Sequence, residues 1–222
     1  MCHEDADDEA RDARLRCLRR WAGNTGALLD VLADGGGELL EHAGVAVSTL
    51  SPAQACLDAH AIGLADEPWP AAEADRVRVE ELRRALQEVE ALGVAGRPAD
   101  ARARAAEVLH EARALGYGPL EAEAQHAMGR ALEAAGALED ARRAHETAYW
   151  LAQSHGHDRV MAESATFLVA LLAGDLQRLD DAESWARHAH AVVDRMGPSA
   201  ADVAMVLANH EGMLALRQND PR

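Results

Sequence analysis

The sequence contains no lysine, so all 22 of its basic residues are arginine. This absence excludes from the chain a phosphate-loop lysine, a Schiff-base lysine and the lysine with which a protein kinase holds ATP. The 38 acidic residues outnumber the arginines and give a formal net charge of −16. Because such a charge opposes binding to phosphate backbones, we expect no nucleic-acid partner.

Aromatic residues are also scarce, at 3% of the chain, although hydrophobic residues make up 49%. Alanine and leucine must therefore dominate the core. Small side chains suit closely packed helices, whereas a β-sandwich favours valine, isoleucine, tyrosine and phenylalanine. The composition predicts an all-α protein, and 222 residues are enough for one or two domains with a substantial core.

Cysteine and long apolar runs are the remaining absences. The three cysteines form no Cys-x-x-Cys pair, and we interpret Cys17 and Cys56 as small buried hydrophobes. No run of 18 apolar residues occurs, and the N-terminal residues 1–5 are acidic where a signal peptide would be basic. We expect a cytoplasmic protein with no membrane partner.

The first 69 residues are predicted to form an N-terminal helical segment. Residues 5–33 form one long helix or two collinear ones, with an apolar stripe at Leu15, Leu18, Ala22, Thr25, Leu29 and Leu32. A homodimer through this helix is a weaker alternative, because Gly23 and Gly26 lower its helix propensity. Three glycines at 35–37 end it, short helices follow at 38–49 and 53–57, and a loop at 65–70 marks the boundary.

Residues 70–222 are predicted to be an array of helix pairs. Helices are expected at 71–92 and 99–115, as two helices joined by a turn at Gly136 within 119–154, at 158–174 and 180–196, and from Pro198 to about Arg217. Asp158 is expected to cap its helix. Ala101, Ala141 and Ala182 begin the second helix of each pair and are spaced 40 and 41 residues apart. The units are about 70–117, 118–156, 157–197 and a half repeat at 198–218, so we expect a chain truncated mid-repeat.

Residues 122–148 resemble the tetratricopeptide repeat (TPR). With Ala122 as the first position, the motif residues are Gly129 at the eighth, Leu132 at the eleventh, Gly136 at the fifteenth, Ala141 at the twentieth and Ala148 at the twenty-seventh. Gln125 departs from the usual tryptophan, and Gln153 from the late proline. The resemblance implies a right-handed superhelix of antiparallel helix pairs, an α-solenoid.

Four further stretches are similar to the region that follows the catalytic domain in large bacterial serine/threonine protein kinases with TPR tails. They are Arg16–Arg20, Ala55–Asp58, Ala112–Tyr117 and Trp185–Ala189. The glycine-rich loop, His-Arg-Asp and Asp-Phe-Gly motifs of a kinase are absent. The resemblance therefore implies a regulatory, protein-binding scaffold for signalling, with any kinase domain upstream.

Catalytic and metal-binding patterns fail when they are tested. His110, His145 and His210 are each followed by glutamate, but no second histidine lies four positions on, so the helical zinc motif is incomplete three times. No Gly-x-Ser-x-Gly nucleophile motif occurs. We expect no catalytic residue, no metal site, no cofactor and no enzyme activity.

The remaining prediction concerns the surface. In TPR arrays the second, fifth, ninth and twelfth positions of each first helix line a concave groove. The residues carried over are Arg83, Leu86, Glu90, Glu123, His126, Arg130, Glu133, Glu163, Thr166, Asn209 and Met213. The resemblance implies a protein or peptide partner held there by a few hydrogen bonds. The alternative is a small-molecule sensor whose ligand lies inside the superhelix.

Overall fold

The computed structural model describes residues 2–34, 53, 56 and 70–219, and the regular elements of these ranges are all helical. They are α1 (Cys2–Asp34), α3 (Glu73–Val94), α4 (Pro98–Leu115), α5 (Gly118–Ala134), α6 (Leu138–His155), α7 (Asp158–Gly174), α8 (Leu179–Met196), the 3-10 helix η3 (Gly197–Ala200) and α9 (Ala201–Gln218). The all-α prediction is confirmed for this part of the chain. The short helices predicted at 38–57 and the boundary loop lie almost wholly outside the described residues.

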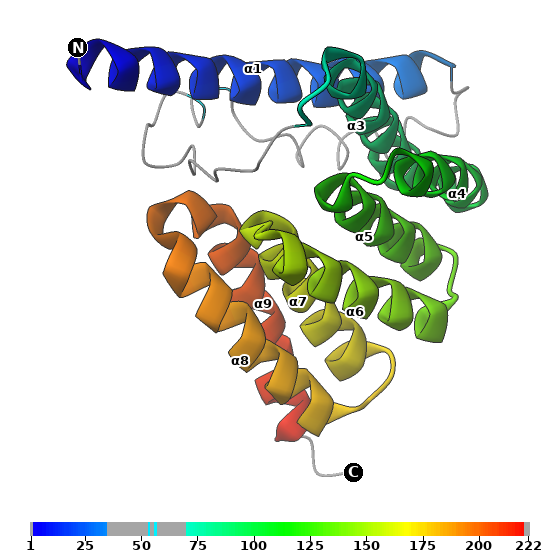
Figure 1. Ribbon diagram of the computed structural model, residues 1–222. Coiled ribbons are helices and arrows are strands. Elements are labelled where there is room, and N and C mark those ends of the chain that lie inside the picture. The colour runs from blue at the N-terminus through cyan, green and yellow to red at the C-terminus, as the bar shows by residue number, and fades with distance from the viewer. Residues whose placement is uncertain (1, 35–52, 54–55, 57–69, 220–222) are drawn as a thin grey trace.

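Helix α1 is one continuous helix, but its buried face differs from the predicted stripe. Leu15 and Leu29 are 41% and 58% exposed, whereas Leu28 and Val31 are buried. The C-terminal part of α1 packs on α3, as Figure 1 shows, and there Leu28 and Val31 join the cluster that contains Val89. The buried face of α1 is therefore rotated by about one residue from the face that the apolar periodicity predicted, because contact with α3 decides which side chains are covered.

Helices α3 to α9 follow one another from α1 toward the C-terminus, and each contacts the next (Figure 1). Four of the turns between them contain a glycine in the left-handed region, with φ between 70° and 75°, and these glycines are 20 residues apart. They are Gly96, Gly116, Gly136 and Gly156. Glycine adopts this conformation without the steric cost of a Cβ. In the turn after α7 the left-handed residue is Gln177, with φ 53°.

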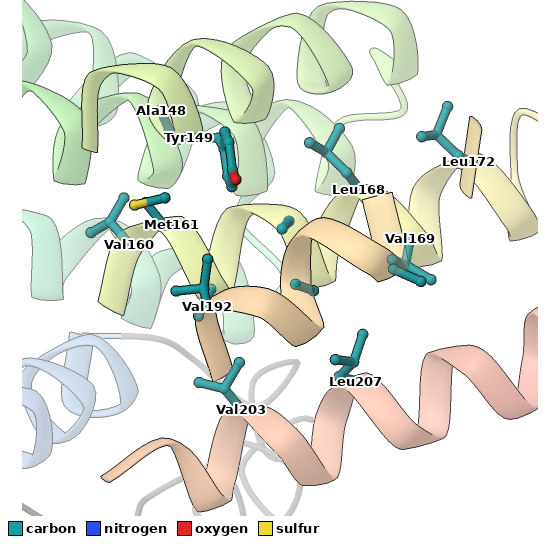
Figure 2. Packing of buried hydrophobic residues seen from close by; sticks show 14 of the residues in the cluster. Ala148, Tyr149, Val160, Met161, Leu168, Val169, Leu172, Val192, Val203 and Leu207 are labelled. Atoms are coloured by element: carbon teal, nitrogen blue, oxygen red, sulfur yellow. The ribbon is translucent and has the colours of Figure 1, made fainter. Parts of the chain in front are cut away.

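Small side chains lie where the helices of a pair meet. Ala101, Ala141 and Ala182 have no exposed surface, so the prediction that they face neighbouring helices is confirmed. Larger apolar side chains fill the space beyond them. Figure 2 shows Tyr149 of α6, Leu168 of α7 and other side chains of α6 to α9 meeting in one cluster.

Two details of the predicted elements are wrong. Asp158 does not cap α7, because His157 precedes the helix and Asp158 is its first residue. The carboxylate of Asp158 instead accepts hydrogen bonds from Arg195 of α8, at 2.9 Å from Nε and 2.7 Å from Nη2. The last helix is preceded by a separate 3-10 turn, η3, so α9 begins at Ala201. The carboxylate of Asp158 thus pairs with a distant helix and does not cap its own.

Cys56 is 3% exposed, which agrees with its interpretation as a buried residue. It is also disulfide-bonded, so its interpretation as a free small hydrophobe is wrong. The side chain of Cys17 lies outside the described residues. Within the described ranges, no helix combines the length and the apolar character that crossing a bilayer requires.

Candidate partner-binding face

All the residues predicted to bind a partner lie on α3, α5, α7 and α9, the first helices of the successive pairs. These helices also contact one another, α3 with α5, α5 with α7 and α7 with α9. We call the surface that they share, and that carries the predicted residues, the inner face. The structure therefore brings residues from four separated stretches of sequence onto neighbouring helices.

The interior of this face holds an ion-pair network centred on Glu123. Its Oε1 lies 2.6 Å from Nη2 of Arg83 on α3 and 3.0 Å from Nε2 of His157, which precedes α7. Burial alone would raise the pKa of Glu123, but the charges of Arg83 and His157 outweigh it and hold that pKa well below its usual range. The carboxylate stays ionised and joins three consecutive parts of the array.

Arg130 and Glu90 form a second contact between α5 and α3, with 3.1 Å between Nη1 and Oε1. The two side chains are 39% and 53% exposed, so solvent and a partner can both reach them. The guanidinium of Arg130 also lies 4.7 Å from the centroid of the Phe167 ring on α7. Arg130 thus lies where α3, α5 and α7 meet.

Two of the predicted residues are oriented inward. Thr166 is 1% exposed and belongs to the core, so it does not present a side chain to a partner. His126 is partly buried between α5 and α7, and its Nδ1 lies 3.0 Å from the Oγ of Ser164. Burial and the charges of Arg130 and Arg159 lower the pKa of His126 to about 3, so its imidazole is neutral at physiological pH.

A buried aromatic group beside His126 was not predicted from the sequence. His145 of α6 has no exposed surface, and its ring lies parallel to that of Phe167 with 5.6 Å between centroids. Neither ring nitrogen of His145 has a hydrogen-bond partner among the described residues. A Cβ added to Gly129 would lie 2.7 Å from this ring. The absence of a side chain at Gly129 is therefore what makes room for His145, and the periodicity of apolar residues does not predict this contact.

Polar contacts continue from α7 to α9. Arg159 pairs with Glu163 of its own helix and reaches Asp202 of α9, with 2.9 Å between Nη1 and Oδ1. His210 of α9 lies 3.0 Å through Nδ1 from the backbone oxygen of Thr166. The predicted residues Asn209 and Met213 lie on the same helix, exposed and partly buried respectively.

The inner-face contacts join residues that are 34–44 positions apart in the sequence, the shortest separation being that of Glu123 and His157. Arg83 and Glu123 are 40 residues apart, as are Glu90 and Arg130. The separation is 38 for His126 with Ser164, 43 for Arg159 with Asp202 and 44 for Thr166 with His210. These values lie close to the 40 and 41 residues between the aligned alanines. Residues one unit apart in sequence are neighbours in space.

A cleft between α1, α3 and α4 is a second concave feature, which the sequence analysis did not predict. It is open to solvent, has a volume of about 750 Å³ and is lined by Gly23 and Gly26 of α1, by Arg84 and Gln87 of α3 and by Arg104 of α4, among others. Arg104 is paired with Glu88 and Glu107, whereas Arg84 has no ion pair or hydrogen bond within the described ranges.

Comparison with known proteins adds no assignment. No protein-family model, curated protein or solved structure matches this chain significantly. Among the described residues, no group of three or more histidine, cysteine, aspartate or glutamate side chains is placed to hold a metal ion. The TPR resemblance and the inner face as a binding surface therefore stay predictions.

Proposed function

We propose that the chain is a non-enzymatic scaffold of the TPR type, whose helix pairs stack into a right-handed superhelix and whose inner face binds a protein partner. The observation that supports this most directly is that inner-face contacts recur between residues 34–44 positions apart in the sequence. Such contacts are expected when each structural unit packs on the next in a one-dimensional stack.

The chemistry of the accessible inner-face residues suggests the kind of partner. Glu90, Arg130, Glu133 and Glu163 keep 53%, 39%, 29% and 27% of their side chains exposed. Both charge signs are present, and Asn209 adds an amide. A peptide segment held by a few hydrogen bonds fits this mixture better than an apolar helix would. The resemblance to kinase tails further suggests a regulatory role in signalling.

Affinity capture with matched charge reversals tests the proposal. In Glu90→Arg, a side chain that is 53% exposed and lies 3.1 Å from an arginine on the inner face changes sign. In Glu183→Arg, a side chain that is 57% exposed and lies 3.3 Å from Arg187 on α8 changes sign in the same way. We expect wild type and Glu183→Arg to recover the same partner from native cell extract, and Glu90→Arg to lose it.

Equal recovery by both variants would remove the inner face from the proposal. Thermal unfolding of each variant serves as the folding control. Because the two positions match in residue type, exposure and pairing, a general effect of charge would weaken both variants alike.

A small-molecule sensor is the second candidate function, and the cleft between α1, α3 and α4 favours it. Its volume of about 750 Å³ lies within the range of ligand pockets. Arg84 offers a cationic side chain without a partner in the described part of the chain. A ligand at about 100 times its dissociation constant would stabilise the chain by about 2.7 kcal/mol, so a thermal-shift screen should find it. Arg84→Ala should abolish that shift.

A further inference from the structure

Aromatic side chains gather at one place on helices α6 and α8. The chain has four tryptophans, two tyrosines and one phenylalanine, and three of these seven residues meet there together with a histidine. Tyr149 and Trp150 of α6 and Trp185 and His188 of α8 have ring centroids 4.9–6.2 Å apart in all six pairings. We call these four side chains the aromatic patch.

The patch runs from the core to the solvent. Tyr149 is 3% exposed and belongs to the core cluster of Figure 2, and its Oη lies 3.2 Å from Nδ1 of His188. Trp185 and His188 are partly buried, and Trp150 is 50% exposed. The ring of Tyr149 meets those of Trp150 and Trp185 edge to face, at 90° and 82°. Buried neighbours therefore hold an exposed indole in a fixed orientation.

The stacking of the helix pairs does not by itself require this patch. The aligned alanines place corresponding residues 40 or 41 positions apart. One unit before Trp150, Trp185 and His188, the corresponding residues are His110, Ala144 and Thr147. The preceding pairs thus stack without an indole at these positions, which leaves the two tryptophans available for another role.

A carboxylate lies one helical turn before each tryptophan. Glu146 precedes Trp150 by four residues and Asp181 precedes Trp185 by four, so each shares a helix face with its tryptophan. Glu146 accepts a hydrogen bond from Arg142 at 2.6 Å, and Asp181 accepts one from Arg178 at 2.7 Å. Both carboxylates keep exposed surface, 29% and 49% of the side chain. Such pairs are weak at a surface, so a second cation can share the carboxylate.

The surrounding charge favours a positive ligand. Helices α6 and α8 together carry seven carboxylates and four arginines, in a chain whose net charge is −16. Arg130 shows the contact that such a ligand can make, since its guanidinium lies 4.7 Å from the centroid of the Phe167 ring. No arginine of the described residues lies over Trp150 or Trp185 in this way.

We propose that the aromatic patch, with Glu146 and Asp181, binds an arginine side chain of a basic peptide segment. The planar guanidinium stacks on an indole face and donates hydrogen bonds to a carboxylate at the same time. The indole faces supply contact area, and the two carboxylates select a cation over a neutral apolar group. The inner face lies on α3, α5, α7 and α9 and contributes nothing to this site, so the two proposals fail independently.

Nuclear magnetic resonance of the tryptophan indole N–H groups tests the inference. The probe is the peptide acetyl-Gly-Arg-Gly-Arg-Gly-amide at neutral pH. Its control carries citrulline in place of each arginine, because citrulline keeps the shape of the side chain and lacks the charge. We expect the arginine peptide to shift the signals of Trp150 and Trp185 saturably, the citrulline peptide to leave them in place, and the signal of Trp21 on α1 to stay unmoved.

Substitution of the exposed indole should weaken this binding. Trp150→Leu keeps an apolar side chain beside Tyr149 and removes the aromatic face. We expect it to bind the arginine peptide about twofold to thirtyfold more weakly, the range that a cation–π contact supplies. Leu216→Ala removes a side chain that is 75% exposed on α9 and should bind like the wild type.

A matched pair of charge removals tests the carboxylate. Glu146→Gln and Glu183→Gln each remove one glutamate that accepts a hydrogen bond from an arginine of its own helix. We expect only Glu146→Gln to weaken binding, because Glu183 lies two residues from Trp185 and therefore on another side of α8. Circular dichroism and thermal unfolding confirm that each variant is folded.

Three results would overturn the inference. They are equal binding of the arginine and citrulline peptides, indole signals of Trp150 and Trp185 that do not move, and equal affinity in Glu146→Gln and Glu183→Gln. The last comparison decides even if Trp150→Leu fails to fold. Equal binding of a peptide with lysine in place of arginine would overturn the choice of a guanidinium, because an ammonium cannot stack in the same way.

Discussion

Individual side chains of this chain are used mainly to join neighbouring helices. Glu123 illustrates the point, since its side chain is 17% exposed and receives hydrogen bonds from Arg83 of α3 and His157 before α7. A carboxylate so placed is stable only while its partners remain, because burying an unpaired charge is costly. The same residue that could recognise a partner therefore also holds the fold together.

Removing the cation from this network should destabilise the chain. We expect Arg83→Met to lower the free energy of unfolding by about 2–4 kcal/mol, because Glu123 is left with a single partner in a mostly buried place. The exposed pair of Arg143 and Asp140 is the control, and Arg143→Met should cost less than about 1 kcal/mol. Urea denaturation measures both. Equal losses would show that Glu123 is solvated well enough to do without Arg83.

The buried histidines should make stability depend on pH. The pKa of His126 is lowered to about 3, and burial together with His126 and Arg130 lowers that of His145 as well. As pH falls below about 6.5, these histidines become protonated in the unfolded chain but stay neutral in the folded chain. The free energy of unfolding therefore falls by about 1.4 kcal/mol per pH unit for each histidine. This stability is complete above pH 6.5 and is lost progressively below it.

Urea denaturation between pH 7.5 and pH 5 measures this slope, in a range where Glu123 with its lowered pKa stays ionised. His145→Met keeps an apolar side chain of similar volume and removes one of the two histidines. We expect the slope to fall by about 1.4 kcal/mol per pH unit in this variant. An unchanged slope would mean that His145 accepts its proton in the folded chain.

At the scale of the elements, the helices were predictable because glycine and proline residues mark their ends. Gly96, Gly136 and Pro119 lie at turns and a helix start as expected, because few other residues tolerate those conformations. The buried side of α1 was not predictable, since several apolar faces were available and only contact with α3 decides between Leu28 and Leu29. The predicted cap at Asp158 is absent because its carboxylate accepts a hydrogen bond from Arg195, which is 37 residues away in the sequence.

Gly129 of α5 and Gly212 of α9, each the twelfth residue of its helix, should respond differently to the same change. Alanine is favoured over glycine in a helix by about 1 kcal/mol, and Gly212→Ala should gain this because nothing lies within 4 Å of the new Cβ. Gly129→Ala gains the same propensity, but its Cβ meets the buried ring of His145 at 2.7 Å. Overpacking costs about 1–3 kcal/mol.

We therefore expect Gly129→Ala to be less stable than Gly212→Ala by about 1–3 kcal/mol in chemical denaturation, since the propensity gain cancels between them. Equal stability would show that the ring of His145 can move at no cost.

At the scale of the whole molecule, the aligned alanines predicted the helix contacts but not the polar network. Ala101, Ala141 and Ala182 are fully buried, as small residues at regular spacing indicated. The links between Arg83 and Glu123 or between Arg130 and Phe167 join different units, and no local pattern in the sequence encodes such pairs. The residues of the inner face could be outlined from the register that the resemblance to the tetratricopeptide repeat implies. Tertiary packing decides which of these side chains are exposed to a partner, and the register does not.

Site-specific photo-crosslinking tests most directly whether the inner face is the recognition surface. A photoreactive amino acid is placed at position 90 or 209 of the inner face, or at the exposed positions 143 and 183 of α6 and α8. We predict that the partner recovered by the wild type crosslinks from positions 90 and 209 and not from positions 143 and 183. Crosslinking from α6 and α8 alone, while the partner still binds, would contradict the proposal.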